Sequence, residues 1–368
     1  MATTVAPNQI QEERRDALAG RLLQSFQGAA DMLAVYLGDR LGYYRALADH
    51  GPATSAELAA RTRSNERYAR EWLEQQAATA VIDVDVADKD AKERRYTLPE
   101  GHAEVLADAD SLSYMTPLAM SFAAAARKTE ELVDAYRTGG GVSWAQFGKE
   151  MRESQEAFNK PLFLKQLAQE VIPAIADVHE RLRADPAARV ADIACGAGWS
   201  SIAIAKGYPK VRVDGFDLDA PSIEMARANA RDAGVADRVR FEAQDAGAAK
   251  VADRYELVTI FEALHDLSQP VEVLRTARQI LAKGGTVLVV DERTAEHFTA
   301  PADELDRIFY GFSILVCLPD GMSRQPSVGT GTVMRPATMR RYAQEAGFRD
   351  IEILPLEPGF FRVYRLLT

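Results

Sequence analysis

The chain has 368 residues and a net charge of −10, from 54 acidic and 44 basic side chains. A chain this long exceeds one small hydrophobic core, so we expect more than one domain. The acidic balance excludes general attraction to phosphate backbones, and the two distant cysteines, Cys195 and Cys317, exclude a disulfide framework. The first residues lack the pattern of a signal peptide and no apolar run approaches membrane-spanning length, which predicts a soluble cytoplasmic protein without a membrane partner.

Residues 1–110 predict a helical and winged-helix domain that begins with a disordered tail of about ten residues. Apolar residues at helical spacing over 20–50 indicate two helices with a break near Gly38 to Gly42. Thr54, three residues before Glu57, forms a capping-box signature for the next helix. A turn, a second helix over 66–77 and two short strand-like runs follow. The side chains expected to point inward from the second helix are Tyr68, Trp72 and Leu73.

A winged helix also suggests DNA binding, and the charges of this region argue against that function. Acidic residues outnumber basic ones by 19 to 13 over residues 1–110. Arg67 and Arg70 of the would-be recognition helix are interleaved with glutamates, as on a solvated helix face. We therefore expect no nucleic-acid partner.

Residues 111–185 are expected to form a helical linker, broken at Gly139 to Gly141 and rich in aromatic side chains. Most of these aromatics are explained by packing between domains. The alternative is that Phe158 and Asn159 close over a bound cofactor or substrate, with Trp144 shaping the pocket.

The first strand of the C-terminal domain, predicted over 189–193, runs into a glycine turn with Gly196 and Gly198, and a helix follows at once over 199–206. Such a turn lets a ligand approach bare backbone beside the N–H groups of the helix. The next strand, over 211–216, ends in Asp217, which is placed to accept hydrogen bonds from ribose hydroxyls.

Two further acids indicate which nucleotide the turn would bind. Asp192, inside the turn, would repel a pyrophosphate and attract a sulfonium or ammonium cation. Asp245 and Ala246 end the third strand, where the acid suits the exocyclic amine of adenine. The implied ligand is an adenine nucleoside that carries positive charge.

These residues, in this order and spacing, resemble the class I S-adenosylmethionine-dependent methyltransferases over roughly 187–368. The resemblance implies S-adenosyl-L-methionine as cofactor. One departure is Ala194, where this family usually has glycine; alanine is tolerable there if its φ stays negative. The expected cofactor-binding residues are Asp192, Ala194, Gly196, Gly198, Asp217, Leu218, Asp245, Ala246 and Phe261.

His265 follows the fourth strand, predicted over 255–260, at the carboxyl end of the sheet. An imidazole suits removal of a hydroxyl proton during methyl transfer, and His265-Asp266 resembles the His-Asp pair of plant-type small-molecule O-methyltransferases, whose histidine is the base. A histidine here could instead cap a helix. Asp291, after the fifth strand over 286–290, could orient the ring, but no second flanking acid stands out near Thr332 to Arg335.

An insertion over 293–336 follows the fifth strand and is expected to build the acceptor pocket, with Tyr310 and Met322 among its lining residues. We interpret Cys317 as a small buried hydrophobe. The spacing of histidines and cysteines predicts no metal. A helix over 337–346 and two strands joined at Pro358-Gly359 form a closing hairpin.

The expected fold is α/β: a Rossmann-like doubly wound sheet with a C-terminal antiparallel hairpin, preceded by an all-helical and winged-helix domain. The expected parts are a dimerisation domain (1–110), a linker that covers the active site (111–185) and a methyltransferase domain (186–368). The predicted function is methyl transfer by a homodimer to a small-molecule acceptor, at oxygen, with nitrogen or carbon as alternative acceptor atoms. A DNA-binding regulator that senses S-adenosylmethionine and a non-catalytic cofactor-binding scaffold stay open as alternatives.

Overall fold

The structure, a computed structural model, describes residues 7–85, 90–245 and 254–368. It divides the chain into two compact units, Met1–Ala123 and Ala124–Thr368. Most of the stretch that we expected to be a separate linker therefore belongs to the second unit. The reason is packing, because apolar side chains such as Phe163 and Leu167 lie in the same core as the strands.

The first unit is a set of helices with a two-stranded antiparallel wing, and it has its own core around Tyr43, Tyr44 and Trp72. The capping box at Thr54 is present, as the sequence predicts. Tyr68, however, is 77% exposed, so its predicted inward position is wrong. The buried face of its helix follows Ala69, Trp72, Leu73 and Gln76, and Tyr68 lies outside this stripe. The elements are α1 (Pro7–Arg40), α2 (Tyr43–His50), α3 (Ser55–Thr62), α4 (Glu66–Ala78), β1 (Asp83–Val84), β2 (Tyr96–Thr97) and α5 (Glu100–Leu106).

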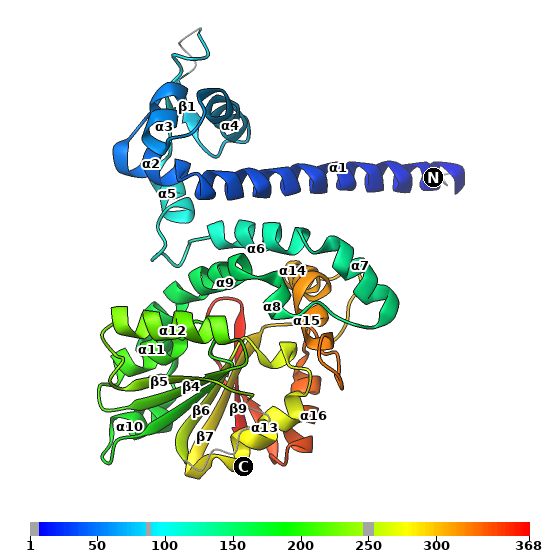
Figure 1. The fold of residues 1–368 in the computed structure, drawn as a ribbon. Helices are drawn as coiled ribbons and strands as arrows, with labels where there is room; N and C mark the ends of the chain where they lie inside the picture. The colour runs from blue at the N-terminus through cyan, green and yellow to red at the C-terminus, as the bar shows by residue number, and fades with distance from the viewer. Residues whose placement is uncertain (1–6, 86–89, 246–253) are drawn as a thin grey trace, which may run out of the picture. The chain divides into compact units, whose positions relative to one another are not determined.

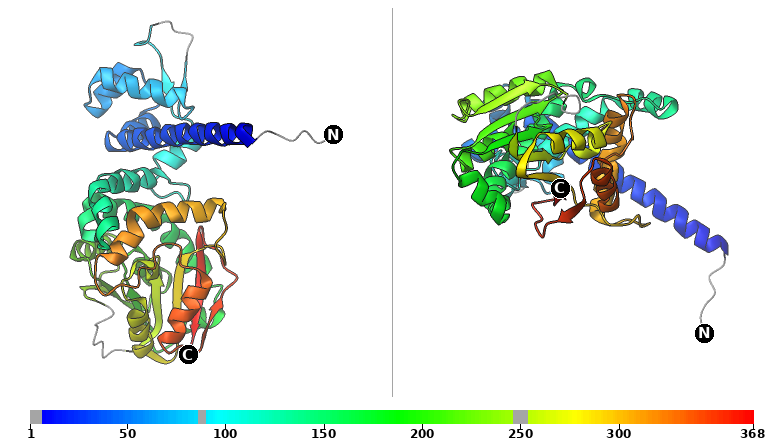
Figure 2. Two further views of the ribbon diagram at one scale, coloured as in Figure 1. Left: turned by 90° about the vertical axis from the view of Figure 1, so that its right-hand side faces the viewer. Right: turned by 90° about the horizontal axis from the view of Figure 1, so that it is seen from below.

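Helix α1 is longer than the sequence suggests, since it begins at Pro7, inside the expected tail. It is drawn as one long rod in both views of Figure 2. Gly42, with φ of +70°, separates it from α2, which explains the predicted break. Much of α1 is exposed, including the large side chains Leu22 and Phe26.

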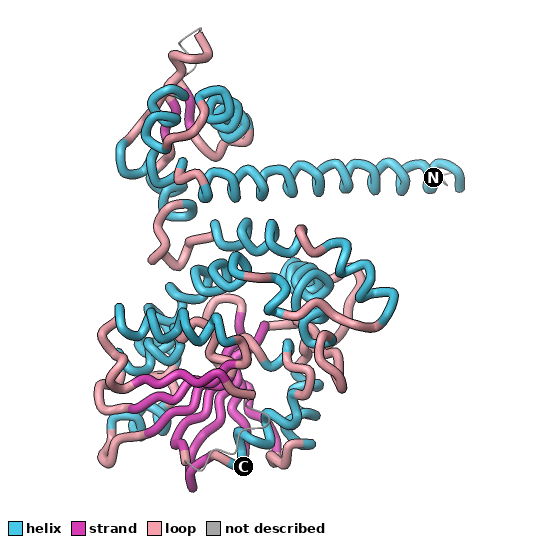
Figure 3. The backbone as a smooth tube through the Cα atoms, in the orientation of Figure 1, coloured by secondary structure: helices cyan, strands magenta, loops and turns pink. Residues whose placement is uncertain are grey.

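The second unit is built on a seven-stranded sheet with the order β5-β4-β3-β6-β7-β9-β8. The first five strands in this order are parallel, and β9 pairs antiparallel with both β7 and β8. Figure 3 shows these strands side by side in magenta. This is the predicted Rossmann-like sheet with its closing hairpin. The strands are β3 (Arg189–Ile193), β4 (Arg212–Asp217), β5 (Val239–Ala243), β6 (Tyr255–Phe261), β7 (Leu281–Glu292), β8 (Asp350–Ile353) and β9 (Phe361–Leu367).

Helices cover both faces of this sheet (Figure 1). Alternate residues of β3 show why: Val190 packs in one apolar cluster, whereas Ala191 and Ile193 pack in the other. Helix α6 (Thr116–Ala126) spans the residue boundary between the two units. The helices of the second unit, only some of which cover the sheet, are α7 (Thr129–Thr138), α8 (Trp144–Phe147), α9 (Lys149–Leu162), η1 (Phe163–Val171), α10 (Ala176–Arg183), α11 (Trp199–Gly207), α12 (Ala220–Asp232), η2 (Leu264–Asp266), α13 (Pro270–Gln279), α14 (Glu304–Phe312), η3 (Ser313–Cys317), α15 (Leu318–Met322) and α16 (Pro336–Glu345).

The insertion after β7 contains a helix that runs from α14 through η3 into α15, and η3 is a π-helical segment. Pro319 has no N–H, and its ring would collide with the carbonyl of Leu315 in a regular α-helix. The wider turn at this point accommodates the proline. None of the helices in the described ranges combines the length and apolar character that a bilayer crossing requires.

Candidate functional site

The glycine turn after β3 has the open backbone that a ligand needs. Gly196 has φ of +51°, and a Cβ added there would meet no atom within 4 Å. Gly198, at φ of +81°, is packed instead, since its added Cβ would lie 2.5 Å from the ring of Phe241. Ala194 has φ of +56°, so the negative φ that would make alanine tolerable at this position is not adopted. This alanine adopts the left-handed conformation that glycine takes without cost.

Asp217 closes the turn from the end of β4. Its carboxylate accepts hydrogen bonds from the backbone N–H groups of Gly196 at 2.9 Å and Asp219 at 2.8 Å. Burial raises the pKa of Asp217, and these two hydrogen bonds oppose the shift. The next residue, Leu218, is 46% exposed at the same edge of the sheet. The predicted ribose site is thus a preformed corner in which a carboxylate lies beside bare backbone.

Asp192 is fully engaged with protein groups. Its carboxylate accepts hydrogen bonds from the hydroxyls of Ser200 and Ser201 at 2.6 Å and of Thr259 at 2.8 Å. These contacts join β3 to β6 and to the first turn of α11. Burial raises the pKa of this carboxyl group, against the effect of the three hydroxyls. Its predicted contact with the cofactor stays a prediction.

The remaining predicted cofactor residues lie at the same end of the sheet or outside the described residues. Asp245 is exposed after β5, with the guanidinium of Arg324 3.9 Å away. Phe261 ends β6 and is buried, with its ring centroid 5.5 Å from that of Phe163. Ala246 lies outside the described residues.

Helix α9 is attached to this end of the sheet by polar contacts. Arg152 forms a two-point ion pair with Asp219, at 2.5 and 2.7 Å. Glu156 accepts hydrogen bonds from the indole of Trp199 at 3.0 Å and the amide of Asn229 at 2.6 Å. Because Trp199 begins the helix after the glycine turn, α9 lies beside the predicted cofactor site.

The same helix carries the two residues predicted to cover the ligand, Phe158 and Asn159, and both are half-buried. Asn159 hydrogen-bonds the carboxyl group of Glu262, to which the amide of Gln155 also donates at 3.3 Å. Glu262 directly follows β6 and has φ of +51°, a rare backbone conformation for glutamate. Burial raises the pKa of Glu262 to about 8. Sequence reasoning missed this residue, although its place after the fourth strand could have drawn attention to it.

His265 lies in η2 and is almost completely buried among carboxylates. Its Nδ1 lies 2.8 Å from Asp291 and 2.9 Å from Glu292, both at the end of β7. Its Nε2 lies 3.1 Å from Asp266. The predicted pair of His265 and Asp291 is therefore formed. The second flanking acid, which we did not find near Thr332, is Glu292, the neighbour of Asp291.

We define the His265 centre as His265, Asp266, Asp291, Glu292 and Cys317. Burial and neighbouring charges shift the pKa values of several of these groups. Burial alone would lower the pKa of His265, but the three carboxylates raise it well above its usual value. Burial opposes ionisation of Asp291, whose pKa is nevertheless low because His265 stabilises its charge. Burial raises the pKa of Glu292 well above its ordinary range.

Cys317 is not merely a small hydrophobe, as we expected, because its thiol borders His265 and Asp266. Burial raises the pKa of this thiol to about 12. Met322, from the same helical insertion, and Tyr310 are half-buried, and the Tyr310 hydroxyl lies 3.4 Å from the guanidinium of Arg335.

Trp144 and the insertion meet at Asp320. The backbone N–H of Trp144 donates to the Asp320 carboxylate at 2.7 Å, and burial raises the pKa of Asp320 to about 7. A Cβ added at Gly141 would lie 2.1 Å from the carbonyl oxygen of Pro319, so the loop before α8 packs directly on α15. The predicted acceptor-pocket residues Trp144 and Met322 therefore come from neighbouring segments.

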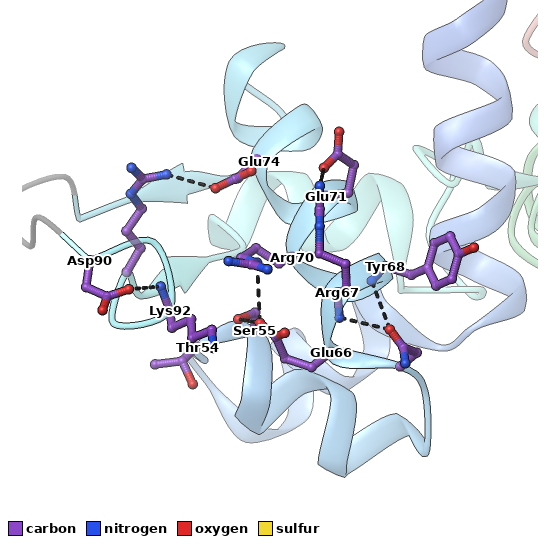
Figure 4. A network of polar contacts seen from close by, with 12 residues as sticks. Thr54, Ser55, Glu66, Arg67, Tyr68, Arg70, Glu71, Glu74, Asp90 and Lys92 are labelled. Carbon is purple, nitrogen blue, oxygen red and sulfur yellow. Dashed lines mark hydrogen bonds and ion pairs between the residues drawn. The ribbon is translucent and has the colours of Figure 1, made fainter.

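The winged-helix unit presents ion pairs on its would-be recognition helix, α4 (Figure 4). Arg67 pairs with Glu71 at 2.5 Å and Arg70 with Glu66 at 3.4 Å. Glu74 pairs with Arg94 from the segment before β2. These arginines already have carboxylate partners, so α4 offers little free positive charge to a phosphate backbone.

Family comparisons match both units. The family described as "Methyltransferase domain" matches residues 184–313, and the family described as "Rv2258c-like winged HTH domain" matches residues 29–108. Among curated proteins, the chain is 26% identical over 180 residues to a ubiquinone biosynthesis O-methyltransferase of Burkholderia pseudomallei, covering 48% of this chain and 70% of that protein. It is 26% identical over 187 residues to the 27-O-demethylrifamycin SV methyltransferase of Amycolatopsis mediterranei, covering 48% of this chain and 68% of that protein.

Solved structures share the fold over nearly the whole length. The mitomycin 7-O-methyltransferase superposes with a TM-score of 0.71 at 22% identity, covering 97% of this chain and 99% of that one. Human N-acetylserotonin methyltransferase, solved in complex with S-adenosylmethionine, superposes with a TM-score of 0.68 at 17% identity, covering 100% of this chain and 99% of that one. The fold is therefore shared from the winged helix to the closing hairpin.

Proposed function

Because the chain belongs to the S-adenosylmethionine-dependent methyltransferases with an N-terminal winged-helix domain, we propose that it methylates an oxygen atom of a small molecule. The observation that carries this proposal is the His265 centre, a buried imidazole held by carboxylates at the same end of the sheet as the glycine turn. Similar proteins that are named as O-methyltransferases support oxygen as the acceptor atom.

The cofactor would lie along the carboxyl ends of β3, β4 and β5. When bound, S-adenosylmethionine supplies a methyl group on a positively charged sulfur. In this proposal Gly196 leaves room for the ligand, Asp217 accepts hydrogen bonds from the ribose, and Asp245 accepts from the adenine amine.

His265 is the candidate base. Asp291 accepts the proton on Nδ1, which fixes the ring and leaves Nε2 for the proton of the acceptor hydroxyl. Asp266, 3.1 Å from Nε2, is then in place to stabilise the imidazolium that forms. Only the neutral ring can accept a proton. Since the carboxylates raise the pKa of His265, turnover should increase as the pH is raised above neutrality.

The experiment is a screen of phenolic and amine acceptors with isotope-labelled cofactor, followed by mass spectrometry of the product. His265→Gln should lower kcat by about 10²–10⁴-fold while the Kd of the cofactor stays nearly unchanged. The matched control is His297→Gln, which replaces an exposed histidine of the same unit and should change neither quantity.

Three outcomes would contradict parts of the proposal. Equal losses of kcat and cofactor affinity in His265→Gln would make this histidine a structural residue. Methyl groups found only on nitrogen or carbon would refute oxygen as the acceptor atom. A chain that binds the cofactor tightly yet turns over no acceptor would favour the scaffold alternative.

We further propose that two copies of the chain associate through α1. Large apolar side chains recur along this helix at intervals of four and seven residues, and they are exposed in the single chain: Leu22 (62%), Phe26 (70%), Leu33 (42%) and Leu37 (50%). Such a stripe on a helix is the pattern that a second copy would bury. Phe26→Glu should shift the mass in light scattering from dimer to monomer, whereas Gln24→Glu, on the opposite face, should not. A monomeric parent chain would refute this proposal.

A further inference from the structure

The His265 centre also has the composition of a metal site. His265, Asp266 and Cys317 each offer one donor atom, and the three donor atoms all lie within 4.8 Å of one another. The Oδ1 of Asp266 lies 3.1 Å from the Nε2 of His265. We propose that His265, Asp266 and Cys317 bind one thiophilic divalent cation such as Zn²⁺. This inference goes beyond the proposed function and rests on it only for the effect on turnover.

The donor set identifies the class of ion. One imidazole nitrogen, one carboxylate oxygen and one thiolate are zinc-type ligands, and three protein ligands leave a fourth tetrahedral position open. Mg²⁺ and Ca²⁺ prefer sites made of oxygen atoms, so they fit this set poorly. The thiol would coordinate as a thiolate and release its proton to solvent, as coordinated cysteines do.

The surroundings of the three residues support an ion at this point. His265 donates from Nδ1 to Asp291 at 2.8 Å, the arrangement that orients histidine ligands in metal sites. The Oδ2 of Asp291 is buried and has no hydrogen-bond partner within the described residues, and the Oδ1 of Asp266 faces the Nε2 of His265 at 3.1 Å. Three carboxylates thus surround one imidazole, and a divalent cation would compensate their negative charge.

The backbone holds the ligands in place before any ion binds. A Cβ added at Gly321 would lie 3.0 Å from the carbonyl oxygen of Asp266, so α15 packs closely against η2. Cys317 ends the π-helical segment that leads into α15. The other side of the ring, with Asp291 and Glu292, offers no sulfur, and its Nδ1 proton is already bound by Asp291.

A metal ion and a proton would compete for the same lone pair on Nε2 of His265. Under the proposed function, a chain loaded with Zn²⁺ has no free base and should turn over slowly. Removal of the ion by a chelator should restore turnover. The site would therefore make methyl transfer sensitive to free zinc.

The test uses the full chain without an affinity tag and with no cofactor or acceptor present. Co²⁺ is titrated in as a spectroscopic probe, and we expect one equivalent to bind with a thiolate-to-cobalt charge-transfer band in the near ultraviolet. Cys317→Ser should abolish the band, and Asp266→Asn should weaken binding. Asp291→Asn, which removes the support of the ring, should weaken it by about 10–100-fold. The matched control, Cys195→Ser, replaces the other cysteine and should keep the band.

The absence of a stoichiometric band in the parent chain, or a band that survives Cys317→Ser, would overturn the proposal. Loss of binding in Glu292→Gln but not in Cys317→Ser would also overturn it, in favour of the other side of the ring. Because binding is measured without turnover, failure of this site leaves methyl transfer untouched. If the site binds zinc and zinc raises turnover, the base assigned to His265 is wrong, whereas the metal site is supported.

Discussion

The ion pair between Arg152 and Asp219 joins α9 to the start of α12, and Arg152→Met should weaken both the fold and cofactor binding. The two side chains are only 9% and 10% exposed. Removal of one partner from a pair this deeply buried costs about 3–5 kcal/mol, because the other charge loses its compensation. Asp219 also accepts from the backbone N–H and the hydroxyl of Ser222, so part of its charge stays compensated. We therefore expect a loss near the lower end, about 3 kcal/mol.

A double-mutant cycle of Arg152→Met and Asp219→Asn measures this coupling. Urea unfolding followed by circular dichroism gives the free energies, hydrogen exchange shows whether α9 and α12 loosen, and calorimetry gives the Kd of the cofactor. The matched control is Arg340→Met, which breaks an exposed pair with Asp350 and should cost at most about 1 kcal/mol. If the double variant equals the sum of the single ones, the pair contributes nothing of its own and the reasoning fails.

Three further predictions concern the same end of the sheet. Ala194→Gly should leave the melting temperature unchanged or higher, because the relief of about 1–2 kcal/mol of strain in the left-handed region offsets the greater entropy of glycine in the unfolded chain. Ala194→Val should lower the melting temperature, and the reverse order of the two variants in calorimetry would contradict the strain. Gly196→Ala, at φ of +51°, should strain the turn and weaken cofactor binding. Gly198→Ala should destabilise the fold more strongly because its Cβ also meets Phe241; equal losses of stability in the two variants would refute the distinction. The pKa of Glu262 is raised from 4.5 to about 8 in the folded state, so the protein should lose stability as the pH rises from about 5 to 9, because the folded state holds this proton more tightly than the unfolded state does. Glu262→Gln should flatten that dependence, and an unchanged profile of melting temperature against pH in the variant would contradict the assignment.

The strands of the second unit were predictable because each is short, apolar and followed by a distinct signal. The first strand is β3, Arg189–Ile193, with the bounds expected from the sequence. The closing hairpin was also predictable, from its two β-like runs joined at Pro358-Gly359. Local pattern suffices for the central strands β3 and β6 because burial on both faces makes them largely apolar.

The His265 centre was only half predictable. Asp291 follows a strand and so was expected near His265. Glu292 and Cys317 were not, because their proximity to the ring depends on how β7 ends and on the path of the insertion. The spacing of these residues along the chain does not predict such a tertiary contact. The positive φ of Ala194 could not be predicted for a related reason, since the turn sets its φ against the preference of alanine.

The number of residues in the π-helical segment η3 sets the rotation of the following helix, α15, about its axis. Each residue of a helix turns it by roughly 100°, so removing one residue between Ser313 and Cys317 would rotate everything that follows by that angle. Asp320, which holds the backbone of Trp144, would then swing away from it. Deletion of a single residue here would therefore remodel the proposed acceptor pocket around Trp144 while the sheet stayed intact. Related chains could diverge in acceptor preference through that one deletion.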